Sequence, residues 1–246
     1  MTIAVFSLSG APGVTTLSLA LASVWPTPAP VTVVEADASG GDVAAWWRLP
    51  TWPGLLDVAA SSRPGQDYET PAITKFLQVL PGGLRVCVAP VTTDRTEGAL
   101  ELLAQNPKGL KGEEGVTLVD LGRVDPNASA STSLLEASEA AVLVSTSDVA
   151  QLKRVKETLP DLLPHSPRLG LAVVGATRSP AEMTEAIGLP VWAKVPRDAR
   201  TAVFLSGQGQ VRRLDRRPLI KAARSLGHTI EEQTQREGVQ VPEEVP

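Results

Sequence analysis

The chain has 246 residues, of which 43% are hydrophobic and 20% are charged, and its formal net charge is −4. This composition is typical of a globular protein and is too apolar for an intrinsically disordered chain. The length fits one doubly wound domain at least as well as two small ones. The slightly negative charge excludes a general attraction to nucleic acid or anionic lipid.

Neither a membrane span nor a disulfide is expected. No apolar stretch approaches the roughly 20 residues that cross a bilayer, and the start of the chain lacks the basic region of a signal peptide. The single cysteine, Cys87, has no intramolecular partner and is interpreted as a small buried residue. These features predict a cytoplasmic protein.

Short β-branched apolar runs alternate with longer segments of helical character. The expected strands are Ile3–Leu8, Val31–Glu35, Leu84–Val88, Val116–Asp120, Ala141–Ser145, Leu169–Val174 and Val191–Val195. The expected helices cover residues 15–24, 94–105, 148–163, 180–187 and 218–234, with a short one near Leu55–Ala60 in the irregular, proline-bearing stretch Pro50–Pro71. Because the strands lack polar alternation, the pattern predicts a doubly wound, mostly parallel α/β sheet.

The ends of two helices and of the domain can also be predicted. Asp148 precedes an apolar series at helical spacing and is expected to cap the helix that follows it. Pro218 suits the first turn of the last helix. Residues 1–232 are expected to form one domain, and residues 233–246 an acidic, flexible tail without apolar periodicity.

The segment Ser7–Thr16 reads Ser-Leu-Ser-Gly-Ala-Pro-Gly-Val-Thr-Thr and joins the first strand to the first helix. Backbone N–H groups and the helix dipole make such a turn an anion site. A P-loop also needs a lysine for the phosphates and a hydroxyl for Mg²⁺. Thr15 and Thr16 can supply the hydroxyl, but Val14 stands where the lysine should be. By itself, this loop could equally be a glycine turn without a ligand.

At these residues the chain resembles the ParA/MinD family of P-loop ATPases, whose loop reads Lys-Gly-Gly-Val-Gly-Lys-Thr-Thr. In this match, Ser9 and Val14 replace the two lysines, Ala11 replaces a glycine and Pro12 replaces a valine. The resemblance implies that the loop contacts ATP or ADP through Gly10, Ala11, Pro12, Gly13, Val14, Thr15 and Thr16.

Two further segments resemble the acidic parts of that family's site. Val33–Asp42 is similar to an Asp-x-Asp-Pro-x-Gly segment, which implies that Asp37 orients the attacking water and that Glu35 replaces the preceding aspartate. Thr117–Arg123 resembles the Walker B strand, and its Asp120 can hold Mg²⁺ through water. The expected catalytic residues are therefore Asp37 and Asp120, and the expected magnesium ligands are Thr15, Asp37 and Asp120.

The resemblance continues to about residue 230. Ala141–Leu152 resembles the strand and helix after Walker B, and Gly188–Asp198 is similar to a loop that contacts the base, which implies that Pro196 lies beside the nucleotide. The family's adenine-reading asparagine is replaced by Gly175.

The missing lysines should weaken triphosphate binding and slow phosphoryl transfer, because that chemistry depends on positioning and charge. Arg123, next to the Walker B aspartate, is the best candidate for a substitute charge. Arg48 and Arg178 are weaker candidates. Each of the three can also be read as an ordinary solvated arginine.

Three functions remain open. The first is a degenerate, largely inactive member of the family that acts in spatial organisation, partitioning or assembly, as a homodimer or with a partner such as a secretion or pilus motor ATPase. The second is an active Mg-ATPase that uses Arg123. The third is a DNA-associated partition protein that uses Arg212, Arg213, Arg216 and Arg217.

The tail and the tryptophans bear on membrane attachment and on partner binding. The acidic, proline-bearing tail does not suit membrane attachment, which requires a basic amphipathic helix. The aromatic residues Trp46, Trp47 and Trp52 can be interpreted as interface anchors or as core packing.

Overall fold

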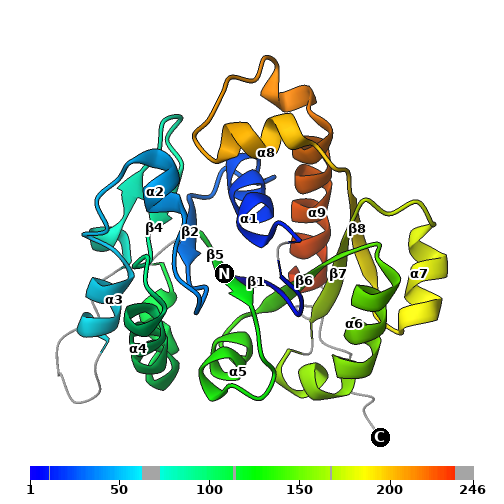
Figure 1. Ribbon diagram of the computed structural model, residues 1–246, viewed down its shortest axis with the longest axis horizontal. Helices are drawn as coiled ribbons and strands as arrows, with labels where there is room; N and C mark the ends of the chain where they lie inside the picture. Colours follow the sequence, from blue (N-terminus) through cyan, green and yellow to red (C-terminus); the bar gives the residue numbers. More distant parts are fainter. Residues whose placement is uncertain (11, 63–72, 113–114, 167, 236–246) are drawn as a thin grey trace, which may run out of the picture.

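The computed structural model of the chain describes residues 1–10, 12–62, 73–112, 115–166 and 168–235. In these residues, eight strands form one sheet in the order β3-β4-β2-β5-β1-β6-β7-β8 (Figure 1). All neighbouring strands run parallel except β3, which is antiparallel to β4 at one edge. The strands are β1 (Thr2–Ser7), β2 (Val31–Glu35), β3 (Gln78–Val79), β4 (Arg85–Cys87), β5 (Val116–Arg123), β6 (Ala140–Thr146), β7 (Leu169–Val174) and β8 (Val191–Val195).

Helices cover both faces of this sheet, so the described chain has three layers. Figure 1 shows α1, α8 and α9 together on one side, with α4, α5 and α6 on the other. The helices are α1 (Val14–Ser23), α2 (Val43–Trp47), α3 (Leu55–Ser61), α4 (Thr93–Gln105), α5 (Ser129–Glu136), α6 (Val149–Leu162), α7 (Pro180–Ile187), α8 (Ala199–Leu205) and α9 (Pro218–Gln235). A short 3₁₀ turn, η4 (Leu214–Arg216), precedes α9.

The central strand shows why the strands read as continuous apolar runs. In β1, Ile3 and Val5 face the layer of α1, α2, α8 and α9, whereas Ala4 and Phe6 face the layer of α3 to α7. All four side chains are completely buried. A strand covered on both faces has no solvent side and therefore no polar alternation. The predicted doubly wound, mostly parallel sheet is confirmed.

The sequence-based elements are confirmed with small shifts, and among the described α-helices and strands three helices and one strand were missed. Asp148 caps α6, because its Oδ1 accepts the N–H groups of Ala150 (3.0 Å) and Gln151 (3.1 Å). Pro218 is the first residue of α9, as predicted. The prediction that β5 ends at Asp120 was wrong, since the strand continues to Arg123. The missed elements are α2, α5, α8 and β3.

The C-terminal boundary stays a prediction. Helix α9 continues through residue 232 to Gln235. The rest of the predicted tail, residues 236–246, and residues 63–72 of the proline-bearing stretch lie outside the described residues. No helix in the described chain combines the length and apolarity needed to cross a membrane.

Candidate functional site

The loop between β1 and α1 has the geometry of an anion site. Gly13 lies directly before α1 with φ 94° and ψ 38°, a left-handed conformation that glycine adopts without steric cost. The first helical bond runs from the Leu17 N–H to the Gly13 carbonyl (2.9 Å). The N–H groups of Val14, Thr15 and Thr16 therefore have no acceptor within the helix.

This loop forms one wall of a cavity of about 660 Å³ at the carboxyl ends of the central strands. Asp37, after β2, and Arg123, at the end of β5, line the same cavity. The structure therefore brings together residues from three separate predicted segments. Their roles as nucleotide and metal ligands stay predictions, and Ala11 lies outside the described residues. The loop residues in the wall are Gly10, Pro12, Gly13, Val14, Thr15 and Thr16.

Val14 occupies the first position of α1, and only 6% of its surface is exposed. Its side chain belongs to the core layer that α1 forms with β1. An apolar, packed residue here offers no charge to an anion in the loop. The position of the family's second lysine is thus filled by a core residue.

Asp120, in the same strand as Arg123, is almost completely buried. The pairing of β1 with β5 shifts register after Val5, which is opposite Asp120, so that Phe6 is opposite Gly122. The Gly122 N–H donates to the Asp120 carboxylate at 3.1 Å, and the Thr15 hydroxyl is bonded to it as well.

The ionisation of Asp120 is strongly perturbed. The pKa of the Asp120 carboxyl is raised from 3.8 to about 7, chiefly by burial and also by the negative charges of Glu35 and Asp37, while the bonds from Thr15 and Gly122 oppose the rise. A divalent cation beside this carboxylate would favour its charged form. A raised pKa at a cavity therefore marks Asp120 as a functional candidate.

Asp37 is held by its own loop and by a close contact with β5. Its Oδ1 accepts the Ser39 N–H (2.9 Å) and the Ser39 hydroxyl (2.7 Å). A β-carbon added to Gly122, where φ is +56°, would overlap the Asp37 carboxyl group. Only glycine at position 122 leaves Asp37 where it lies.

Glu35 is tied to the backbone of two neighbouring segments. Its Oε1 accepts the N–H groups of Asp42 (2.8 Å) and Val43 (2.9 Å), at the start of α2, and its Oε2 accepts that of Ala89 (3.1 Å). Burial raises the pKa of Glu35, and the bonds to Val43, Ala89 and Asp42 oppose this rise. With these three bonds, Glu35 fixes the loop that carries Asp37.

The large cavity carries more negative than positive charge. Its ionisable wall residues are Asp37, Asp42, Glu97, Asp125 and Arg123. A phosphate chain in this setting needs a counter-cation. The wall therefore suits an anion that arrives with a divalent metal.

A smaller polar cavity of about 120 Å³ lies beside the large one, and Thr15, Asp37 and Asp120 line it. Their donors are all oxygen atoms, the type that Mg²⁺ prefers. In the described part of the chain, no group of three or more His, Cys, Asp and Glu residues could hold a metal by itself. These residues fit Mg²⁺ only if the ligand's oxygens and water complete its coordination, which is its usual mode at phosphates.

A third cavity, of about 230 Å³, lies on the other side of the loop and is mostly apolar. Pro196 lines it, together with Pro12, Gly13 and Thr16 of the loop. The loop thus lies between the large cavity, with its charged wall residues, and an apolar one. The Arg197 side chain covers Gly175, because a β-carbon at position 175 would lie 2.8 Å from its Nε.

The loop that carries Pro196 is fixed by an ion pair with α9. The Arg217 guanidinium binds both carboxylate oxygens of Asp198, and its Nε also lies 3.0 Å from the Thr201 hydroxyl oxygen. Burial raises the pKa of Asp198, but the bonds from Arg217 and Thr201 outweigh this and lower it. Because its side chain is engaged here, Arg217 has fewer donors left for a DNA phosphate, and the DNA-binding alternative rests mainly on the other three arginines.

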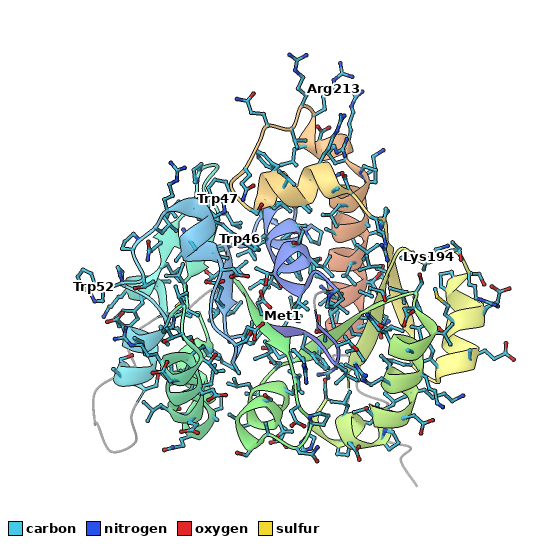
Figure 2. All side chains as sticks on the ribbon, viewed as in Figure 1. Met1, Trp46, Trp47, Trp52, Lys194 and Arg213 are labelled. Carbon is cyan, nitrogen blue, oxygen red and sulfur yellow. The ribbon has the colours of Figure 1, made fainter. Side chains whose placement is uncertain are left out.

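The other three arginines of the predicted DNA-binding group, Arg212, Arg213 and Arg216, are exposed. Arg213 lies at the tip of the molecule, well away from the sheet (Figure 2). Arg216 has a carboxylate of Asp215 at 3.9 Å. The structure therefore leaves three exposed arginines on this tip.

The tryptophans pack in different ways. Trp46 and Trp47 are half-buried against the core of α1 and α9, and the Trp47 indole donates to the Leu205 carbonyl (3.1 Å). Trp46 also lines the large cavity. Trp52 is 71% exposed and lies at the rim of the molecule (Figure 2). For Trp46 and Trp47 the structure favours the core interpretation.

One cation near the loop was missed by sequence reasoning. Nη1 of Arg154, in α6, donates to Ser9 Oγ at 2.8 Å. Of the three arginines named as candidate charges, Arg123 lines the large cavity, whereas neither Arg48 nor Arg178 belongs to its described wall. The sequence contains no signal for Arg154, because its position depends on how α6 packs beside β6.

The comparisons with known proteins agree on the fold. No family model and no curated protein matches the sequence. Among solved structures, the chain is similar to a ParA family ATPase from Chlorobium tepidum, with a TM-score of 0.73, 16% identity and coverage of 92% of this chain and 98% of that one. It is also similar to the cell division ATPase MinD of Pyrococcus furiosus, with a TM-score of 0.74, 19% identity and coverage of 94% and 98%.

A third similar structure is the septum site-determining protein MinD of Pyrococcus horikoshii, complexed with Mg-ADP, with a TM-score of 0.71, 18% identity and coverage of 98% and 100%. At these identities the likeness establishes the fold. The chain has the P-loop α/β fold of the ParA and MinD ATPases, and the resemblance inferred from its motifs is confirmed at that level.

Proposed function

We propose that this chain binds Mg-nucleotide in its loop and hydrolyses it slowly or not at all. The observation that carries the proposal is a contrast around one loop. Thr15, Asp37 and Asp120 surround the small polar cavity at the loop, whereas Val14, at the lysine position, is packed into the core. The parts that hold a metal and a phosphate are retained, and the part that stabilises transferred charge is lost.

The arrangement of the cavities supports a nucleotide rather than a simple anion. Pro12, Gly13 and Thr16 line both the large cavity and the apolar cavity. A ligand with an anionic chain and a flat apolar end would fill both at once, with its phosphates at the start of α1. ATP and ADP have this form, and the MinD of Pyrococcus horikoshii was solved with Mg-ADP.

Magnesium would be held by the Thr15 hydroxyl, by Asp120 and, through water, by Asp37. When bound, Mg²⁺ neutralises phosphate charge and polarises the phosphoryl group. The Asp37 carboxylate, fixed by Ser39, would orient a water toward that group. Without a lysine at position 14, little else in the loop stabilises the transition state, so turnover is slow.

We further propose a cytoplasmic role in spatial organisation, partitioning or assembly. This rests on the fold shared with ParA and with MinD, which is named as a cell division ATPase. The protein would act as a homodimer or through a partner protein such as a secretion or pilus motor ATPase. In such a role the occupancy of the site, rather than its turnover, carries the signal.

Calorimetric titration with ADP and ATP in the presence of Mg²⁺, followed by a phosphate-release assay, tests the proposal. We expect saturable binding with little or no phosphate release. Rapid release that disappears in Asp37→Ala would instead support an active ATPase in which Arg123, in the cavity wall, supplies the missing charge. No binding of either nucleotide would reject a nucleotide function altogether.

DNA association is a second candidate, because Arg212, Arg213 and Arg216 are exposed together on the tip around η4. Binding through phosphates alone would weaken steeply with salt. The test is a mobility-shift assay at low and at physiological salt with the wild type and with the triple alanine variant. No shift of the wild type at low salt would reject this candidate.

A further inference from the structure

We propose that Arg154 supplies the positive charge that the loop itself lacks, by binding phosphate oxygens of the ligand held at Gly10–Thr16. The inference rests on the proposed nucleotide binding and assigns a binding residue to that site. Neither Ser9 nor Val14 can provide this charge, and Arg154 is the cation that touches the first of these two positions.

The contact is between distant parts of the chain. Arg154 Nη1 donates to Ser9 Oγ at 2.8 Å across 145 residues of sequence. Helix α6 is fixed in rotation by the two residues that follow, because Val155 is 2% exposed in the core and Lys156 Nζ donates to the Ala186 carbonyl (2.8 Å). The position of Arg154 beside the loop therefore follows from the packing of the helix.

The charge of this guanidinium is not neutralised by the contact. Ser9 Oγ is uncharged, and within the described chain Arg154 forms no ion pair with a carboxylate. A guanidinium has five N–H donors in a planar fork, so four remain after the bond to Ser9. This fork matches two oxygens of a phosphate group.

The Ser9 hydroxyl adds to this arrangement. It accepts the bond from Arg154, so its own proton remains free to donate. Together, the two side chains present N–H and O–H donors at the start of the loop.

The negative charge of the large cavity shows why an additional cation such as Arg154 would help to bind an anionic ligand. Four carboxylates of the wall face the single guanidinium of Arg123. Arg154 is exposed and approaches the loop from the side of α6. It contacts the loop near its beginning, at Ser9. With Arg123 at the end of β5, the ligand would meet one arginine from each side of the loop.

Helix α6 also provides a matched control. Lys153 precedes Arg154, is exposed and carries the same charge. Replacing Lys153 by alanine changes the net charge by the same amount without touching Ser9. A loss specific to Arg154 therefore separates a direct contact from a general electrostatic effect.

The experiment is calorimetric titration of full-length protein with Mg-ADP and with Mg-pyrophosphate, which carries no base. Arg154→Ala and Arg154→Gln should each weaken both ligands by about tenfold, the usual effect of a charge-assisted bond. Lys153→Ala should change them less than twofold, and Arg154→Lys should fall between wild type and alanine. Thermal melts show whether each variant is folded, and because Arg154 is exposed the melts should coincide.

The outcomes separate this inference from the proposed function. If the wild type binds and both Arg154 variants bind equally well, the assignment of Arg154 is wrong while the nucleotide site stands. An equal loss in Lys153→Ala would also overturn it, because the effect would then be nonspecific. If the wild type binds neither ligand, the proposed function fails and this assignment fails with it.

Discussion

Gly122 and Asp37 are packed against each other so closely that no β-carbon fits between them. One residue lies in the bulged strand β5, and the other lies in the loop after β2. The contact sets the distance between the two acidic segments of the site. The position of Asp37 therefore depends on the absence of a side chain at residue 122.

Gly122→Ala should displace Asp37 and place alanine at a positive φ of 56°. We expect the free energy of unfolding to fall by about 1–3 kcal/mol and Mg-dependent nucleotide binding to be lost. Urea unfolding and calorimetry measure the two effects. Gly98→Ala is the control, because that glycine lies in α4 with open space around it. A Gly122→Ala variant that matches wild type in both assays would contradict the role of this contact.

Asp120→Asn should stabilise the unliganded protein at pH 8. The pKa of Asp120 is raised from 3.8 to about 7, so the folded state holds its proton more tightly than the unfolded state. The stability that this carboxyl contributes is therefore complete below pH 3.8 and is lost as pH rises to about 7. At about 1.4 kcal/mol per pKa unit, the asparagine variant would gain up to about 4 kcal/mol at pH 8 and clearly less at pH 5.

Urea unfolding of wild type and Asp120→Asn at the two pH values checks this. The variant should at the same time lose Mg-dependent nucleotide binding. The asparagine amide cannot carry the negative charge that a bound Mg²⁺ would favour. An equal stability gain at pH 5 and pH 8 would show that the effect does not come from ionisation.

The affinity for Mg-nucleotide should depend on pH through the same carboxyl. Magnesium requires the charged form of Asp120, whose pKa is about 7. Affinity should be constant above pH 8 and fall by up to about tenfold per pH unit below 7. Titrations between pH 6 and 8.5 measure this. A flat wild-type profile would exclude Asp120 as a metal ligand.

Val14→Lys should restore a charge at the start of α1. Val14 lines the cavity at the helix N-terminus, so a longer side chain can extend into that space. We expect Mg-ATP to bind about tenfold more tightly at a cost of roughly 1 kcal/mol in stability for the lost core packing. Val14→Met matches the length without the charge, and equal affinity in the two variants would contradict the expectation.

Arg217→Ala should destabilise the protein rather than change a DNA contact. The Asp198 side chain is 2% exposed and would lose its partner, at about 1–3 kcal/mol. Because the pKa of Asp198 is lowered, this contribution is present above pH 4 and is lost as the pH falls further. Urea unfolding at pH 7 and pH 3 measures the difference. Arg216→Ala, at an exposed neighbour, should leave stability unchanged.

The sequence predicts the longer elements of this fold well, for physical reasons. Buried parallel strands are apolar throughout, and α6 begins with a side-chain cap that is visible in the sequence. The missed elements are short or polar: β3 has two residues, and α2 has five. Two residues cannot display a period, and five span little more than one helical turn.

The candidate site also has parts that the sequence predicts and parts that it does not. The loop and the two acidic segments are local patterns, so a motif can find them. The contact of Arg154 with Ser9 and that of Arg197 with Gly175 join distant segments, and only packing decides them. The role of Arg217 was missed for that reason too, since an arginine-rich run looks solvated until a buried carboxylate such as Asp198 is placed beside it.

The loop residues shared by the two cavities have a consequence for how this protein can change. Pro12, Gly13 and Thr16 line both the large cavity and the apolar cavity. A substitution at any of them alters the space on both sides of the loop at once. If the proposed nucleotide binds here, a mutation that changes how its base is bound would also change how its phosphates are bound. The two properties would therefore be genetically coupled at these three positions. Independent tuning is open only to residues that line one cavity, such as Arg123 on one side and Pro196 on the other.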